Sequence, residues 1–184
     1  MSATKSKITS SGGATAAALR GLTAFFIAAI IATSATAAVA PKVSIQSYEQ
    51  LPTPLPFPYV EGDATNRVLS AQAQAAAQHK LLLIDLGGNW CADCRILSGV
   101  MLLPEVRAFV DAHYVVVTVD VGRLNRNMQI PAHYHVSVGG VPSLLIVEPN
   151  SDRLLNVGQT EALARAGRET PQALADWLAR WVGS

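Results

Sequence analysis

The chain has 184 residues, half of them hydrophobic, with 14 Lys and Arg residues against 13 Asp and Glu residues. This length suits one domain preceded by a leader, and the apolar content is sufficient for a sizeable core. The charge is nearly balanced and forms no basic stripe interleaved with aromatic side chains, which argues against a nucleic-acid-binding surface.

The first part of the chain has the features of an export signal. Its basic residues are Lys5, Lys7 and Arg20. An apolar run follows at residues 22–31, and small residues then provide an A-x-A cleavage site. We therefore expect a signal peptide at residues 1–37. The alternative is an uncleaved membrane anchor, because residues 22–40 carry no charge over nearly the length of a membrane span. Both interpretations place the rest of the chain outside the cytoplasm.

The next segment, residues 38–64, is rich in proline. Its prolines are Pro41, Pro52, Pro54, Pro56 and Pro58. Alternating prolines favour an extended chain with few backbone donors. We interpret this segment as a linker, or as an arm laid over the domain that follows at residues 65–184.

The first half of that domain alternates helix and strand. Asp63 is a predicted cap for a helix over the alanine-rich stretch that follows. Residues 81–86 form a short apolar run with Asp85 inside it, which predicts a buried strand. A helix follows from the cysteines, and Pro104 is well placed to open another. Residues 114–121 are continuous and β-branched, as in a second buried strand.

The second half begins with residues 122–140, which are polar and predicted to be irregular. Residues 143–147 form a predicted third strand, and residues 154–157 are expected to pair beside it after a turn. The last helix is capped by Thr170 and has Pro171 in its first turn. The first two strands should be parallel because a helix connects them. The order of elements predicts an α/β fold in which helices cover both faces of a central sheet.

Cys91 and Cys94 are the two cysteines of the chain, and they form a Cys-x-x-Cys pair. The pair follows a strand and opens a helix, whose N-terminal amides favour a thiolate at the first position. We therefore expect Cys91 to be the exposed, attacking residue and Cys94 to be the more buried, resolving residue. A separation of three residues places both sulfurs on one helix face, within disulfide reach.

Metal binding is the main alternative for this pair. Cys-x-x-Cys is half of a zinc site, and His133 and His135 are its only candidate complement. A copper-handling or metalloprotein-assembly factor would use Cys91, Cys94 and one histidine, because thiolates suit Cu(I). A structural disulfide is a third interpretation, but so short a loop restrains the unfolded chain very little. The redox interpretation requires neither a metal nor an organic cofactor.

Residues 82–95 resemble the active-site segment of the thioredoxin family. Asp85 lies six residues before the first cysteine, where the family carries its buried acid, and Trp90 matches the tryptophan directly before that cysteine. Val141 and Pro142 resemble the family's cis-proline segment. The chain is also similar to secreted bacterial thioredoxin-like proteins and to the soluble domain of the membrane-linked thiol reductase of the periplasm.

This resemblance implies a thioredoxin fold with a central mixed sheet, and a thiol–disulfide oxidoreductase. Asp85 would help to deprotonate Cys94, directly or through water. Trp90, Val141 and Pro142 would contact the partner protein, with a cis bond before Pro142. The expected partners are protein disulfides or dithiols in the periplasm, and a membrane-embedded thiol electron donor. Contact with the membrane itself is expected only if the leader is uncleaved.

The residues between and beside the cysteines are expected to tune the redox potential. They are Ala92, Asp93 and Arg95. Asp93 would repel a thiolate on Cys91, which favours a reductant over a strong oxidant. The chain also departs from the family pattern, because Gly87 stands where an aromatic residue is usual and the second strand has no lysine.

Overall fold

A computed structural model describes residues 38–183, so the predicted signal peptide at residues 1–37 lies outside the described residues. The helices are α1 (Ala64–Gln78), α2 (Ala92–Met101), α3 (Pro104–His113), α4 (Gln129–His133) and α5 (Pro171–Ala179). The strands are β1 (Leu81–Gly87), β2 (Tyr114–Asp120), β3 (Ser143–Glu148) and β4 (Arg153–Leu154). Two 3₁₀ turns occur at Tyr48–Gln50 and Ala166–Arg168. Within the described part of the chain, no helix combines the length and the apolar character needed to cross a membrane.

The four strands form one sheet in the order β2-β1-β3-β4. β1 is parallel to β2, with Leu81 opposite Tyr114, and antiparallel to β3. The parallel pairing follows from the crossover through α2 and α3. This crossover returns the chain to the end at which β1 starts, so β2 runs in the same direction as β1. The sheet is therefore mixed, as the predicted α/β fold with a central mixed sheet requires.

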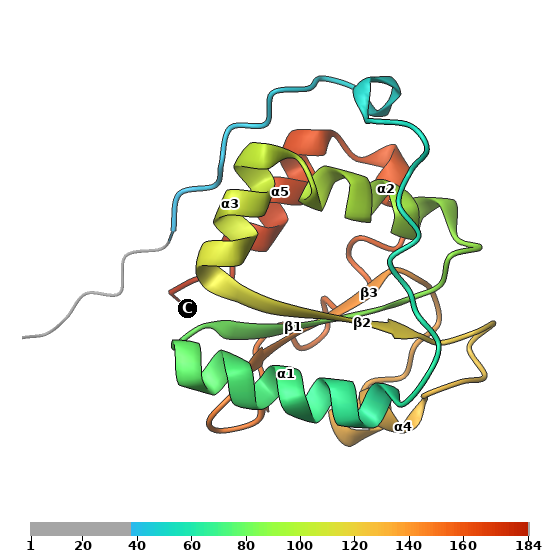
Figure 1. The fold of residues 1–184 in the computed structure, drawn as a ribbon, viewed down its shortest axis with the longest axis vertical. Helices are drawn as coiled ribbons and strands as arrows, with labels where there is room; N and C mark the ends of the chain where they lie inside the picture. The colour runs from blue at the N-terminus through green and yellow to red at the C-terminus, as the bar shows by residue number, and fades with distance from the viewer. Residues whose placement is uncertain (1–37, 184) are drawn as a thin grey trace, which may run out of the picture. The chain divides into compact units, whose positions relative to one another are not determined.

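Helices cover both faces of this sheet: α1 and α4 lie on one side, and α2, α3 and α5 on the other (Figure 1). In β1, Leu82, Ile84 and Leu86 pack in the cluster with α1, whereas Leu83 packs in the cluster with α2, α3 and α5. All four are fully buried. A strand covered on both faces is apolar at consecutive positions, which explains the continuous run in the sequence. Asp85 shares the face of Leu83 because side chains alternate along a strand.

Three helices begin at the predicted residues. The Asp63 carboxylate accepts a hydrogen bond from the Asn66 amide at 3.0 Å, and the Thr170 hydroxyl accepts one from the Ala173 amide at 3.1 Å. Pro104 is the first residue of α3. Each cap satisfies an amide that the first helical turn leaves without a partner, so α1 and α5 start where the capping residues occur.

Residues 38–63 form an arm that runs along the domain before α1 begins (Figure 1). Leu51 and Tyr59 of the arm are buried in the two core clusters. The Tyr48 hydroxyl donates a hydrogen bond to the Ala166 carbonyl at 2.7 Å. The arm therefore shares the hydrophobic core and the hydrogen bonds of the domain on which it lies.

Residues 122–140 are less irregular than predicted, because they contain α4. Ile130 and Pro131 of this helix are buried, and Ile130 joins the cluster on the α1 face. A helix of five residues is too short for apolar periodicity to reveal it in the sequence.

The fourth strand is shorter than the predicted residues 154–157 and lies one residue earlier. The Asn156 side chain accounts for its early end. Its Oδ1 accepts a hydrogen bond from the Ile146 amide at 2.9 Å, and its Nδ2 donates one to the Leu144 carbonyl at 2.7 Å. A side-chain amide thus takes the place of a neighbouring strand in the hydrogen bonds of the β3 backbone at Leu144 and Ile146.

Candidate active site

Cys91 lies at the junction of β1 and α2 and caps the helix. Its sulfur accepts a hydrogen bond from the Cys94 backbone amide at 3.1 Å. The Cys91 amide in turn donates to the Gly88 carbonyl at 3.0 Å, which closes the turn between strand and helix. An amide directed at a sulfur favours the thiolate over the thiol. The local fold therefore stabilises negative charge on Cys91.

The two cysteines differ in acidity. The hydrogen bond from the Cys94 thiol lowers the pKa of Cys91 to about 7, against the opposing effect of burial. The same interaction, together with burial, raises the pKa of Cys94. Both residues are free thiols in the structure. Cys91 is therefore the more acidic thiol of the pair, and the assignment of Cys91 as attacking residue and Cys94 as resolving residue stays a prediction.

Cys91 is less exposed than the sequence predicts. Its side chain is 6% exposed and that of Cys94 is 0% exposed, so their order is as expected but Cys91 is not an open surface residue. The Val141 carbonyl lies 3.5 Å from the Cys91 sulfur and accepts a hydrogen bond from its thiol. The segment before β3 therefore covers Cys91, a contact between distant parts of the chain that sequence spacing does not report.

Val141 and Pro142 belong to this covering segment. The peptide bond between them is cis, which agrees with the prediction. β3 begins at the next residue, Ser143, so the sheet fixes the position of the Val141 carbonyl beside Cys91. The role of this segment in binding a partner stays a prediction.

Asp85 lies in the middle of β1 and is 1% exposed. Burial raises the pKa of its carboxyl to about 7, and a hydrogen bond from Tyr59 lowers it in part. The donor is the Tyr59 hydroxyl, 2.9 Å from Asp85 Oδ1. A carboxyl with a pKa near neutral exchanges protons readily under physiological conditions, as a general base must.

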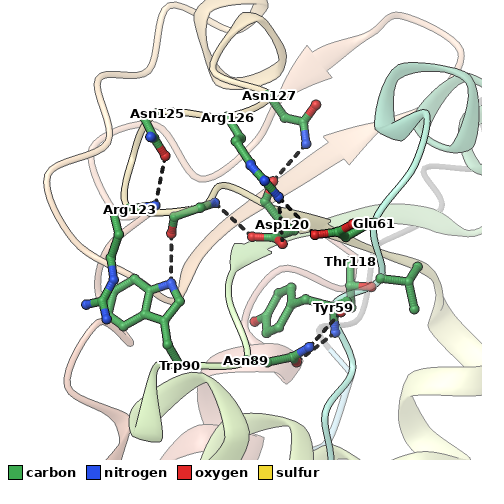
Figure 2. Close-up of polar contacts among 12 residues, drawn as sticks. Tyr59, Glu61, Asn89, Trp90, Thr118, Asp120, Arg123, Asn125, Arg126 and Asn127 are labelled. Atoms are coloured by element: carbon green, nitrogen blue, oxygen red, sulfur yellow. Dashed lines mark hydrogen bonds and ion pairs between the residues drawn. The ribbon is translucent and has the colours of Figure 1, made fainter.

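Tyr59 is the residue of the site that the sequence interpretation missed. It comes from the proline-rich arm, is 3% exposed, and is held by Asn89, whose side chain pairs with both its amide and its carbonyl (Figure 2). Gly87 provides the space, since a Cβ at Gly87 would lie 2.3 Å from the Tyr59 hydroxyl oxygen. A signal existed in the sequence: the absence of the usual aromatic residue at Gly87, together with a tyrosine at the end of the prolines.

Trp90 lies on the surface beside Cys91 and is 47% exposed. Its indole nitrogen donates to the Gly122 carbonyl at 2.7 Å, and the Arg123 guanidinium lies 4.1 Å from the ring centroid. Figure 2 shows the indole directed at the loop after β2. Trp90 is therefore held in a fixed orientation next to Cys91, and its contact with a partner stays a prediction.

The residues expected to tune the potential have different surroundings. Ala92 is exposed. The Asp93 carboxylate accepts a hydrogen bond from the Gly167 amide at 2.7 Å, and its charge acts to raise the pKa of Cys91. The Arg95 guanidinium donates to the carbonyls of Pro56 at 3.1 Å and Leu55 at 2.8 Å. Arg95 therefore connects the active-site helix to the arm.

The histidines considered for a metal site are not assembled with the cysteines. His133 lies 2.6 Å from the Asp152 carboxylate, on the α4 side of the sheet. Among residues 38–183, no group of three or more His, Cys, Asp or Glu side chains is arranged to hold a metal ion. The structure thus offers no support for the copper-handling alternative.

Comparison with known proteins agrees with this geometry. A family model described as thioredoxin-like matches residues 63–149. A disulphide isomerase from Xylella fastidiosa Temecula1 is 30% identical, with 68% of this chain and 96% of that chain covered and a TM-score of 0.61. A thioredoxin from Thermus thermophilus is 23% identical, with 48% and 67% covered and a TM-score of 0.39. A search of curated proteins found no match.

The similarity to the Xylella fastidiosa relative covers nearly the whole length of that relative. The family-model match, at residues 63–149, includes the strand, turn and helix of this chain that carry the Cys-x-x-Cys pair, with the buried Asp85 and the cis bond before Pro142. These features are those of a thiol–disulfide oxidoreductase, and the chain belongs to the thioredoxin-like family.

Proposed function

We propose that the protein reduces disulfides of partner proteins outside the cytoplasm, using Cys91 and Cys94. The observation that carries this proposal is the contrast between the two sulfurs: Cys91 caps α2 with a pKa near 7, while Cys94 is fully buried with a raised pKa. This contrast separates an attacking residue from a resolving residue.

The reaction has two exchange steps. The Cys91 thiolate attacks one sulfur of the partner disulfide, forms a mixed disulfide and releases the other sulfur as a thiolate. Cys94 loses its proton and attacks the Cys91 sulfur, which forms the Cys91–Cys94 disulfide and releases the second partner thiolate. Two electrons thus pass from the protein to its partner. A membrane-embedded thiol donor then restores the dithiol.

The reducing direction is favoured by the modest acidity of Cys91. A strong oxidant holds its reduced form through a very stable thiolate, with a pKa of about 3.5 in the extreme case. The Cys91 pKa near 7 is far from that extreme, and the charge of Asp93 acts against the thiolate. Equilibration with glutathione buffers, followed by Trp90 fluorescence, should give a potential well below the strong-oxidant value of about −120 mV.

The partner surface would consist of Trp90, Val141 and Pro142 around Cys91. Trapping tests both the surface and the mechanism. The Cys94→Ser variant should accumulate a mixed disulfide with its partner that dithiothreitol releases, because the resolving thiol is missing. The double variant Cys91→Ser/Cys94→Ser is the control and should trap nothing. Trapping by Cys91→Ser with Cys94 intact, and not by Cys94→Ser, contradicts the assignment.

Isomerase activity is a second candidate, because the Xylella fastidiosa relative is described as a disulphide isomerase. An isomerase rearranges scrambled disulfides with no net electron transfer, so its first cysteine suffices. If the protein is an isomerase, its Cys94→Ser variant should still restore the activity of scrambled ribonuclease without added reductant. A reductase would require both cysteines and a supply of electrons.

The location outside the cytoplasm rests on the predicted export signal at residues 1–37. We expect the full-length protein in the periplasmic fraction of cells expressing it, with the N-terminus of the mature form at Ala38. Retention of the leader and sedimentation with membranes would favour the anchored form. Recovery in the cytoplasmic fraction would contradict export.

A further inference from the structure

The Tyr59 hydroxyl and the Cys94 sulfur both lie over Gly87. A Cβ built on Gly87 would lie 2.3 Å from the Tyr59 oxygen and 2.9 Å from the Cys94 sulfur. Both atoms therefore border the space that the missing side chain of this glycine leaves open. Interactions with the Asp85 carboxylate and with the Cys94 thiol both act on the Tyr59 hydroxyl.

Asp85 acts on Cys94 through its charge and makes its side-chain hydrogen bond to Tyr59. The charge of Asp85 contributes to raising the pKa of Cys94, whereas its side-chain hydrogen bond goes to Tyr59, at 2.9 Å. A base removes a proton through a hydrogen bond to the group that holds it. The Tyr59 oxygen, which lies over Gly87 together with the Cys94 sulfur and donates to Asp85, is therefore the polar group placed to connect the resolving thiol with the buried acid.

We propose that Tyr59 is a catalytic residue of the resolving step, in which its hydroxyl passes the proton of Cys94 to the Asp85 carboxylate. A tyrosine hydroxyl suits this task because it donates one hydrogen bond and accepts another at the same oxygen. This inference rests on the proposed disulfide exchange and adds to it the route by which Cys94 becomes a nucleophile.

The step balances in protons and electrons. The Tyr59 proton moves to Asp85 as the Cys94 proton moves to the Tyr59 oxygen, so the tyrosine ends neutral and the net transfer is from thiol to carboxylate. The Cys94 electron pair then forms the bond to the Cys91 sulfur, and the partner thiolate leaves. Asp85 also borders a pocket of about 260 Å³ between α2, α3 and β2. In this proposal its proton exchanges with solvent through that pocket.

Side chains from two other parts of the chain hold the segment of the arm that carries Tyr59. The Asn89 side chain donates to the Tyr59 carbonyl at 2.7 Å and accepts from its amide at 3.1 Å. The Thr118 hydroxyl donates to the Pro58 carbonyl at 2.9 Å. Figure 2 shows these two anchors, from the segment before Trp90 and from β2. A hydroxyl positioned by two neighbouring elements keeps the geometry that proton transfer needs.

The test follows both steps in the full-length protein and in Tyr59→Phe. The reduced protein is mixed with oxidised glutathione, quenched in acid at intervals, and the mixed disulfide and oxidised protein are counted by mass spectrometry. Tyr114→Phe is the matched control, since Tyr114 is also 3% exposed and its hydroxyl donates to the Leu178 carbonyl at 2.6 Å, away from the cysteines. Circular dichroism checks that each variant is folded.

We expect Tyr59→Phe to slow resolution about 10-fold or more, with mixed-disulfide formation and the Tyr114→Phe control changed by less than about twofold. In mixtures of light and heavy water, the resolution rate of the wild type should depend on the deuterium fraction as a curve, because two protons move together. The dependence should become linear in Tyr59→Phe.

Resolution at the wild-type rate in Tyr59→Phe would overturn the relay. A slower rate with the same linear isotope dependence in both proteins would also overturn it, since the hydroxyl would then only hold Asp85. Failure of the proposed function is distinguishable from both, because the wild type would then form no mixed disulfide with glutathione at all.

Discussion

Asp85 interrupts an apolar strand, and its cost to stability depends on pH. The pKa of its carboxyl is 3.8 in the absence of the fold and about 7 in the folded protein. Below both values the carboxyl is protonated in either state and folding carries no cost from its charge. As pH rises between them, the unfolded state loses the proton first, so stability falls until the folded carboxyl also ionises. The loss amounts to about 4 kcal/mol at most.

The Asp85→Asn variant should remove this pH dependence. We expect its free energy of unfolding to exceed that of the wild type by a few kcal/mol at about pH 8, and by much less at about pH 4. Urea denaturation across this pH range measures the difference. The same excess at both ends of the range would show that the charge of Asp85 is not its cause.

Cys91 should react with iodoacetamide half-maximally near pH 7, because that is the pKa of its thiol. Cys94 should remain unmodified over the same range, since its pKa is raised and its side chain is 0% exposed. In Cys94→Ala the midpoint should move to higher pH, because the hydrogen bond that lowers the pKa of Cys91 is lost. Peptide mapping after alkylation identifies the labelled cysteine, and labelling mainly at Cys94 would reverse the assignment.

At the scale of elements, the arm is attached to the active-site helix through Arg95. Its guanidinium donates to two arm carbonyls and lies 3.9 Å from the Phe57 ring centroid. Prolines leave their carbonyls free to accept hydrogen bonds, and the extended arm presents those carbonyls to α2. The helix that carries the cysteines and the arm that carries Tyr59 are thereby fixed to each other.

The Arg95→Ala variant should lower the free energy of unfolding by about 1–3 kcal/mol, because it removes two charge-assisted hydrogen bonds and a cation–π contact. Arg107→Ala is the control, since Arg107 makes an exposed ion pair with Asp111 at 3.5 Å and such pairs contribute about 0.5 kcal/mol or less. Urea titration and hydrogen exchange at the Tyr59 amide provide the two measurements. Equal effects of the two substitutions would mean that Arg95 does not anchor the arm.

At the scale of the molecule, local signals predicted β1, β2 and β3 and the helices α1, α2, α3 and α5, because caps, apolar runs and prolines act within a few residues. The Cys-x-x-Cys pair and Asp85 were recognisable for the same reason. The burial of Cys91 under Val141 and the docking of Tyr59 over Gly87 were not. Both arise from contacts between segments far apart in the chain, and a proline-rich segment has no apolar periodicity to indicate which of its residues pack inward.

The arm should contribute to the whole domain and not only to the site. A chain that begins at residue 60 should melt at a lower temperature than one that begins at residue 38, because Leu51 and Tyr59 no longer cover the core. Water then reaches Asp85, so the pKa of its carboxyl should fall toward the usual range. Calorimetry and carboxyl NMR titration measure the two effects. Identical melting temperatures and an unchanged titration would assign the arm no structural role.

β2 is an edge strand of the sheet, and the arm passes beside it. The Thr118 side chain of β2 binds the Pro58 carbonyl at 2.9 Å, and Arg67 bridges the carbonyls of Thr118 and Val60. An open edge offers unpaired backbone groups to strands of other molecules, and proline cannot extend such a ladder because it lacks an amide proton. The proline-rich arm therefore also covers this edge at Thr118 and hinders strand pairing with another molecule there.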